Sequence, residues 1–209
     1  MKKGIHIHLC FKKQIYKYDG RKRKMKGVIF VAGVYGVGKS TMCSSLSELL
    51  NIDFYSAGDL ISECNKEIYG RNKKVKDKDN NQNVLVECVE HKLKEKDLII
   101  LAGHFCILGN DDKPDILPEF VYEKIQISVI VLLEASIQTI IKHLEQRDGK
   151  VYLSDLIESF IIQERKQAEK ISQKIKVPLI IHEMTFDSTD VDIIFTKLQE
   201  AYGESFIRY

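Results

Sequence analysis

The sequence contains no run of about 18 consecutive apolar residues, the length that a membrane-spanning helix requires. Its basic N-terminus also lacks the apolar segment of a secretory signal. We therefore expect no membrane association and a cytoplasmic protein. Hydrophobic residues still make up 44% of the 209 residues, which is enough for one domain with a full core.

Cysteine is scarce, and its distribution excludes two classes of protein. The five cysteines are odd in number and scattered, and they form no C-x-x-C pair. Such a set does not indicate a disulfide framework or a zinc site, so we expect reduced thiols throughout. The positions concerned are Cys10, Cys43, Cys64, Cys88 and Cys106.

Acidic residues are almost absent from the start of the chain. Residues 1–26 carry ten Lys or Arg and only Asp19, a net charge of +9, whereas the remainder has 22 basic and 29 acidic residues. We predict a basic N-terminal extension over residues 1–25 and a single domain over residues 26–209. Such an extension could bind nucleic acid, and a short solvated leader explains the same residues.

A glycine-rich segment follows the apolar run at residues 28–32. Residues 33–40 read GVYGVGKS, the G-x-x-x-x-G-K-S spacing of a phosphate-binding P-loop. Glycines permit positive φ, so consecutive backbone N–H groups can surround an anion. Apolar residues after Lys39 recur at helical spacing, and the N-terminus of a helix also favours phosphate. The predicted phosphate-binding residues are Gly33, Val34, Tyr35, Gly36, Val37, Gly38, Lys39, Ser40 and Thr41, with Ser40 as a ligand of Mg²⁺.

Short apolar runs alternate with helical patterns along the rest of the chain. The predicted strands cover residues 28–32, 52–57, 97–103, 125–134 and 177–182. Helical periodicity is found at residues 81–94, 137–144 and 191–198, and Ser154 is a candidate cap for a long helix to about residue 174. This alternation predicts a three-layer α/β/α sandwich with a five-stranded parallel sheet, which binds ligands at the carboxyl ends of its strands.

These segments resemble the adenylate-kinase-like branch of the P-loop kinases over roughly residues 26–205. The resemblance is strongest in FVAGVYGVGKSTMCSSLSELL and continues in FYSAGDLI, similar to the start of the acceptor site. HLEQRDGK is similar to the start of a short lid, and HEMTFDSTDVDIIFTKL to the last strand, loop and helix. The resemblance implies an ATP- and Mg²⁺-dependent kinase that phosphorylates a small acceptor, most often a nucleotide.

The resemblance also implies catalytic roles for two arginines and the P-loop lysine. Phosphoryl transfer needs cations around the transferred group, and Lys39 supplies the first. Arg147 precedes the Asp148-Gly149 turn signal and matches the first lid arginine. Arg165, on the following helix, is the candidate for the second, and a surface arginine is the other interpretation.

Two positions depart from the family pattern. Ala102 stands where the third strand commonly ends in an aspartate that organises the metal, so Mg²⁺ must rely on Ser40, water or another carboxylate such as Asp53. Ser62 stands where adenylate kinases place an arginine for the acceptor phosphate, which puts AMP as acceptor in doubt. The cations that might replace that arginine are Lys66, Arg71 and Lys73.

A kinase for a hydroxyl acceptor, including a nucleic-acid 5′-hydroxyl, is the second hypothesis. A hydroxyl benefits from a carboxylate that takes its proton, and Asp59 follows the second strand where such a base is often found. A first-turn helix aspartate is the competing interpretation of Asp59. His104 follows the third strand and is a candidate for substrate contact or catalysis, and a packed loop histidine is the other interpretation. A nucleotide-binding regulator with weak hydrolysis is the third hypothesis.

Overall fold

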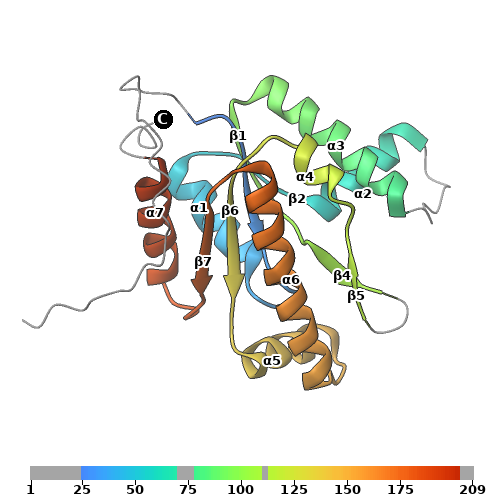
Figure 1. Cartoon of the computed structure of the whole chain (residues 1–209), viewed down its shortest axis with the longest axis vertical. Helices are drawn as coiled ribbons and strands as arrows, with labels where there is room; N and C mark the ends of the chain where they lie inside the picture. Colours follow the sequence, from blue (N-terminus) through green and yellow to red (C-terminus); the bar gives the residue numbers. More distant parts are fainter. Residues whose placement is uncertain (1–24, 70–77, 110–112, 203–209) are drawn as a thin grey trace, which may run out of the picture.

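The computed structural model describes residues 25–69, 78–109 and 113–202, and its centre is a five-stranded parallel sheet (Figure 1). The strand order is β2-β3-β1-β6-β7, and every neighbouring pair is parallel. The strands are β1 (Gly27–Ala32), β2 (Phe54–Ser56), β3 (Leu98–Ala102), β6 (Ile127–Glu134) and β7 (Leu179–Glu183). All five lie within two residues of the segments predicted from the sequence.

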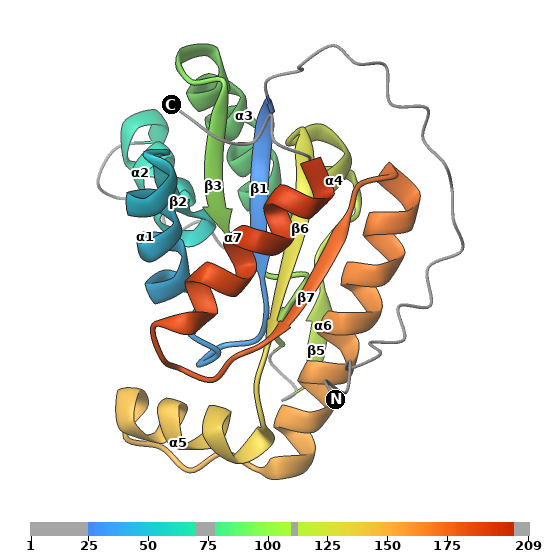
Figure 2. The ribbon, with the colours of Figure 1, turned by 90° about the vertical axis from the view of Figure 1, so that its left-hand side faces the viewer.

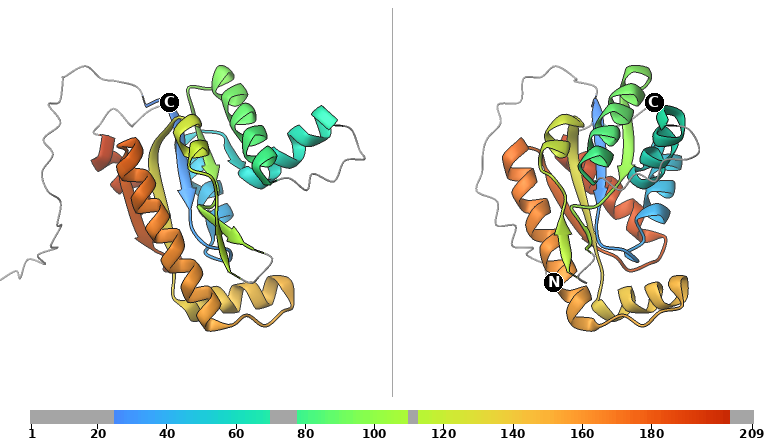
Figure 3. Two further views of the ribbon diagram at one scale, coloured as in Figure 1. Left: turned by 45° about the vertical axis from the view of Figure 1, so that its right-hand side comes forward. Right: turned by 90° about the vertical axis from the view of Figure 1, so that its right-hand side faces the viewer.

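Helices cover both faces of this sheet, which confirms the predicted α/β/α sandwich (Figures 2 and 3). One face packs against α1 (Lys39–Leu50) and α7 (Thr189–Tyr202). The other packs against α3 (Lys78–Glu95), α4 (Phe120–Lys124) and α6 (Ser154–Ile175). Helix α2 (Ala57–Tyr69) lies against α3, and α5 (Ile137–Asp148) crosses the end of the sheet at which the strands stop.

The core of the domain is the middle of the sheet. All residues of β1 and β3 are buried, as expected for strands covered on both faces, whose sequences are continuous apolar runs. On α5 and α6 the buried residues recur at helical spacing, so the apolar periodicity of the sequence predicts both helices. Because β1 and β3 are neighbours in the sheet, the loops that follow them lie beside each other.

The structure adds a β-hairpin that the sequence did not predict, formed by β4 (Cys106–Leu108) and β5 (Pro114–Ile116). Its strands have three residues each, too few to produce a periodic signal. The predicted cap of α6 is wrong. Leu153 occupies the N-cap position, and Ser154 is already the first helical residue. Only the residues 149–153 separate α5 from α6, as expected for a short lid.

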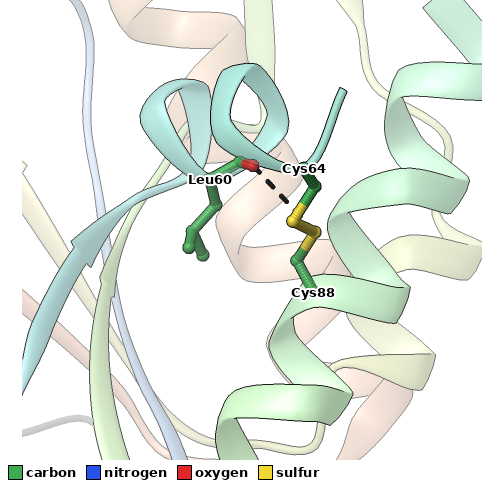
Figure 4. The surroundings of a disulfide bond; sticks show 3 residues. All are labelled: Leu60, Cys64 and Cys88. Atoms are coloured by element: carbon green, nitrogen blue, oxygen red, sulfur yellow. Dashed lines mark hydrogen bonds between the residues drawn. A yellow bond between two sulfur atoms is a disulfide. The ribbon is translucent and has the colours of Figure 1, made fainter. Parts of the chain in front are cut away.

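A disulfide between Cys64 and Cys88 joins α2 to α3, so the expectation of reduced thiols is wrong for this pair (Figure 4). The Sγ atom of Cys88 also lies 4.0 Å from the carbonyl oxygen of Leu60. A spacing of 24 residues carries no sequence signal, because only the packing of the two helices brings the cysteines together. Cys43 is a buried free thiol, and Cys106 is also buried.

Two further expectations concern membrane-spanning helices and the basic N-terminal extension. Within the described ranges, no helix has the length and apolar character needed to cross a membrane. The basic extension, apart from Met25, lies outside the described residues, so its nucleic-acid binding and the domain boundary stay predictions.

Candidate active site

The P-loop connects β1 to α1 at the carboxyl end of the sheet, as predicted. Gly33 has φ +144°, and a Cβ atom there would lie 2.6 Å from the carbonyl oxygen of Leu133. Gly38 is the N-cap of α1 and has φ +91°, a conformation that other residues rarely adopt. These two constraints explain why the loop needs glycine at both ends of its central turn.

Lys39 lies over the P-loop and faces its carbonyl groups. Its Nζ atom donates hydrogen bonds to the carbonyl oxygens of Gly33 at 2.7 Å and Val34 at 2.9 Å. Burial lowers the pKa of Lys39 to about 8, although the nearby carboxylate of Glu164 acts in the opposite direction. At neutral pH the ammonium group is therefore mostly charged, and it can exchange its carbonyl partners for phosphate oxygens.

Glu164 on α6 is a residue that sequence reasoning missed. Its buried carboxylate accepts hydrogen bonds from the backbone N–H groups of Gly33 at 3.2 Å, Phe105 at 3.0 Å and Cys106 at 2.8 Å. Burial raises the pKa of this carboxyl, and the three N–H donors oppose that rise. The Glu164 side chain thus connects the backbone of the P-loop to the backbone of the loop after β3.

His104 lies in that loop, between the P-loop and the helical layer. Its ring packs against the ring of Tyr35, with 4.2 Å between centroids. Its own carbonyl oxygen accepts a hydrogen bond from the Tyr122 hydroxyl at 2.7 Å. Burial lowers the pKa of His104 well below 6.5, and the charge of Lys39 adds to this effect. The imidazole is therefore neutral at neutral pH.

A cavity of about 540 Å³ extends from the P-loop toward α2, α3 and α4. Its polar end contains the P-loop residues Lys39, Ser40 and Thr41, together with Arg147 of α5. Its other end is largely apolar and contains one buried amide, that of Gln82. The apolar lining consists of Phe30, Ile61, Leu85, Ile107, Leu117, Val121 and Ile125. This volume is in the range of small-molecule sites.

Arg147 is the candidate lid arginine, and its catalytic role stays a prediction. It lines the cavity from the last turn of α5, and its guanidinium forms two hydrogen bonds with Asp148, at 2.6 and 2.7 Å. The same helix contacts the P-loop through His143, whose Nδ1–H donates to the Gly36 carbonyl oxygen at 2.8 Å. Arg147 must leave Asp148 to reach a bound phosphate, and more than half of its side chain is exposed, which permits that movement.

Two other predicted catalytic residues are not brought to the cavity. Arg165 pairs with Glu134 through its Nε and Nη2 atoms, with 2.7 Å between Nε and Oε1, and is absent from the cavity lining. Asp59 is exposed in the first turn of α2 and is not a lining residue, although the adjacent Gly58 is. Their catalytic roles stay predictions that this arrangement does not favour.

The site has few candidate ligands for Mg²⁺. Among the described residues no three His, Cys, Asp or Glu side chains group together as a metal site. Asp53 is wrong as a metal ligand, because it precedes β2 at the opposite end of the sheet and pairs with Lys96 at 3.2 Å. Ser40 lines the cavity and is exposed at the start of α1. One hydroxyl fits a Mg²⁺ ion that keeps several waters and binds phosphate oxygens.

Comparison with known proteins gives a family match and several similar folds. The profile of a family described as AAA domain matches residues 32–160. No curated protein sequence matches the chain. A gluconokinase from Sinorhizobium meliloti 1021 has 16% identity and a TM-score of 0.53, with 85% of this chain and 94% of that chain covered.

Two other solved structures show a comparable similarity. A putative kinase from Chloroflexus aurantiacus has 13% identity and a TM-score of 0.51, covering 85% of this chain and 99% of that one. A protein from Thermus thermophilus has 14% identity and a TM-score of 0.52, with 85% and 98% covered. At such identities the similarity shows the fold, and the resemblance to P-loop kinases is confirmed at that level.

Proposed function

Because the chain belongs to the AAA domain family, we propose that it is an ATP-dependent kinase that transfers the γ-phosphoryl group to a small acceptor. The observation that carries this proposal is the single cavity that contains both the P-loop and an apolar compartment. A protein that only binds a nucleoside triphosphate needs the P-loop part of this cavity but not the apolar part. The apolar part adds a surface on which the body of an acceptor can pack beside the phosphates.

The residues that line or support the cavity each have a role in this proposal. The P-loop amides and Lys39 hold the ATP phosphates, and Ser40 contributes a ligand to Mg²⁺. Arg147 moves from Asp148 to the transferring phosphoryl group when the short lid closes. Glu164 acts as a positioning residue, since it holds the backbone of Gly33 and of the loop that contains His104.

The identity of the acceptor is less constrained than the reaction class. A nucleotide acceptor rests on the resemblance to adenylate-kinase-like enzymes and stays a proposal. The shared fold with a gluconokinase is consistent with a small-molecule acceptor of another kind. We further propose residues 26–209 as the kinase domain.

A nucleotide-binding regulator is the second candidate, and Ala102 favours it. This residue lines the cavity at the end of β3, where it supplies no carboxylate to the metal. If no other group completes the coordination of Mg²⁺, the protein would hydrolyse ATP slowly without transferring the phosphoryl group to an acceptor.

The test is to incubate the purified full chain with ATP, Mg²⁺ and one candidate acceptor at a time, and to detect phosphorylated product by mass spectrometry. The acceptors should include nucleosides, nucleoside monophosphates, sugars and 5′-hydroxyl oligonucleotides. A new phosphorylated product, absent with Lys39→Ala, supports the kinase. ATP binding and slow ADP release without any product would support the regulator instead.

A further inference from the structure

Two buried polar atoms in the cavity region lack a hydrogen-bond partner. Among the described residues, Oε1 of Gln82 and Nδ1 of His104 are the buried side-chain nitrogen and oxygen atoms without one. Both side chains line the same cavity, Gln82 from α3 and His104 from the loop after β3. Gln82 is only 6% exposed, so solvent does not satisfy its amide oxygen.

Unsatisfied atoms of this kind are unusual in a folded protein. Leaving a buried acceptor without a donor costs about 1 to 3 kcal/mol. Other buried polar groups of this structure are satisfied. Glu164 accepts three backbone N–H groups, and Asp190 pairs with His182 at 2.7 Å. Both exceptions belong to residues of one cavity lining, beside the space that a ligand would occupy.

From this juxtaposition we infer that the acceptor is an uncharged alcohol with an apolar body. Nδ1 of His104 accepts the hydrogen bond of the hydroxyl that receives the phosphoryl group. Oε1 of Gln82 accepts from an N–H or O–H group on the body of the same molecule. This inference rests on the proposed kinase function and specifies its acceptor.

His104 is suited to the first contact by its position and its protonation state. It is held beside the P-loop by the Tyr35 ring and by the Tyr122 hydroxyl. The backbone of Gly33 raises the pKa of the imidazole, as expected when a ring N–H donates to the Gly33 carbonyl. Because Nδ1 has no partner, that N–H is on Nε2, and Nδ1 keeps a free lone pair.

The charge distribution favours an acceptor without a phosphate. In the described part of the cavity lining, full positive charges belong to Lys39 and Arg147, and both lie at the P-loop end. The surfaces around Gln82 are instead aliphatic, with Ile61 and Leu85 among them. Among the side chains that the structure describes, no cation lies at this end to offset the lost hydration of a phosphate monoester; the side chains of Lys66, Arg71 and Lys73 lie outside the described part.

The chemical step is a phosphoryl transfer from ATP to oxygen. The acceptor oxygen forms a bond to the γ-phosphorus while the bond from that phosphorus to the β,γ-bridging oxygen breaks, and its electron pair stays on ADP. The hydroxyl proton passes to Nδ1 of His104 and then to solvent when the product leaves. The neutral imidazole thus orients the hydroxyl before transfer and takes its proton as transfer completes.

The first experiment compares acceptors that differ only in charge. The full chain is given ATP, Mg²⁺ and nucleosides, each paired with its 5′-monophosphate, together with alicyclic and aromatic alcohols. Phosphorylation of an uncharged alcohol, with kcat/KM at least tenfold above that of its monophosphate partner, is expected. Preference for monophosphates, or ATP binding without phosphorylation of any alcohol, would overturn the inference. Absence of ATP binding would instead contradict the proposed function.

The second experiment uses the best alcohol and matched variants. His104→Phe keeps the ring that packs on Tyr35 but removes the lone pair, and should lower kcat on the order of 10²-fold. His104→Asn restores an acceptor near Nδ1 and should recover part of that loss. Gln82→Leu should raise the alcohol KM about tenfold, equivalent to one lost hydrogen bond, and leave the ATP Kd unchanged. Parent-like kinetics in His104→Phe and Gln82→Leu would overturn the assignment of these residues.

Discussion

The carboxylate of Glu164 accepts a hydrogen bond from the backbone N–H of Gly33, 131 residues away in the sequence and 3.2 Å away in space. The same carboxylate accepts from Phe105 and Cys106, so the phosphate-binding loop and the loop of His104 share one support. Because the support comes from the middle of α6, the geometry of both loops depends on how that helix packs.

Glu164→Gln should therefore destabilise the domain. Glutamine retains one acceptor oxygen but turns an NH₂ group toward backbone N–H donors, which leaves at least one buried donor unsatisfied. The expected loss is about 2 to 4 kcal/mol in the free energy of unfolding, measured with urea. Glu158→Gln, on an exposed position of the same helix, is the control and should change stability by less than about 0.5 kcal/mol. Equal stability of the two variants would show that Glu164 is not a support.

The pKa of Lys39 predicts a pH dependence of ATP binding. Burial lowers this pKa to about 8 in the free protein, and bound phosphates should raise it. Between these two values the free protein has lost a proton that the complex retains, so binding takes up a proton there. ATP affinity should be constant below pH 7 and should fall above pH 8, by up to tenfold per pH unit.

Titration calorimetry at several pH values, in buffers of different ionisation enthalpy, measures both the affinity and the proton uptake. The effect should be absent in Lys39→Ala, whose weak residual binding has no ammonium to titrate. An affinity of the parent that stays constant from pH 7 to 9.5 would mean that Lys39 does not contact the phosphates.

Arg147→Ala should lower kcat far more than ATP affinity. A lid arginine reaches the phosphoryl group only on closure, so its contact strengthens in the transition state. The expected loss in kcat is on the order of 10³-fold, and Arg147→Lys should recover little because lysine lacks the planar guanidinium. Lys142→Ala, at an exposed position of the same helix outside the cavity lining, is the control and should leave kcat near the parent value. Near-parent turnover in both Arg147 variants would favour the nucleotide-binding regulator.

Reduction of the Cys64–Cys88 disulfide should loosen the acceptor end of the cavity. Helix α2 supplies Ile61 to this end and α3 supplies Gln82, and the disulfide fixes the two helices to each other. Loss of a cross-link between residues 24 apart should cost about 3 kcal/mol of stability. The acceptor KM should rise in Cys64→Ser while the ATP Kd stays the same. A rise in both the acceptor KM and the ATP Kd would show that loss of the disulfide disturbs the whole fold and not the acceptor end alone.

The sequence predicted the parts of the site that depend on local pattern. The P-loop is a contiguous motif, and Arg147 lies in the last turn of a helix with clear periodicity, so sequence alone singles out both; the catalytic role of Arg147 stays a prediction. Glu164 was missed because its three partners are distant in the sequence and a single glutamate in the polar segment QERKQAEK has no distinguishing signal. Gln82 carries no local signal either, because its role depends on a cavity lined by residues from several separate elements.

The central claim is that the chain transfers a phosphoryl group from the P-loop to an acceptor in the same cavity. The most direct measurement is the rate of ADP formation with and without an acceptor, in the parent and in Lys39→Ala, with the phosphorylated product quantified in parallel. The account predicts that the acceptor accelerates ADP formation in the parent, that product and ADP form in equal amounts, and that Lys39→Ala forms neither. ADP formation that no acceptor accelerates, or that Lys39→Ala retains, would contradict it.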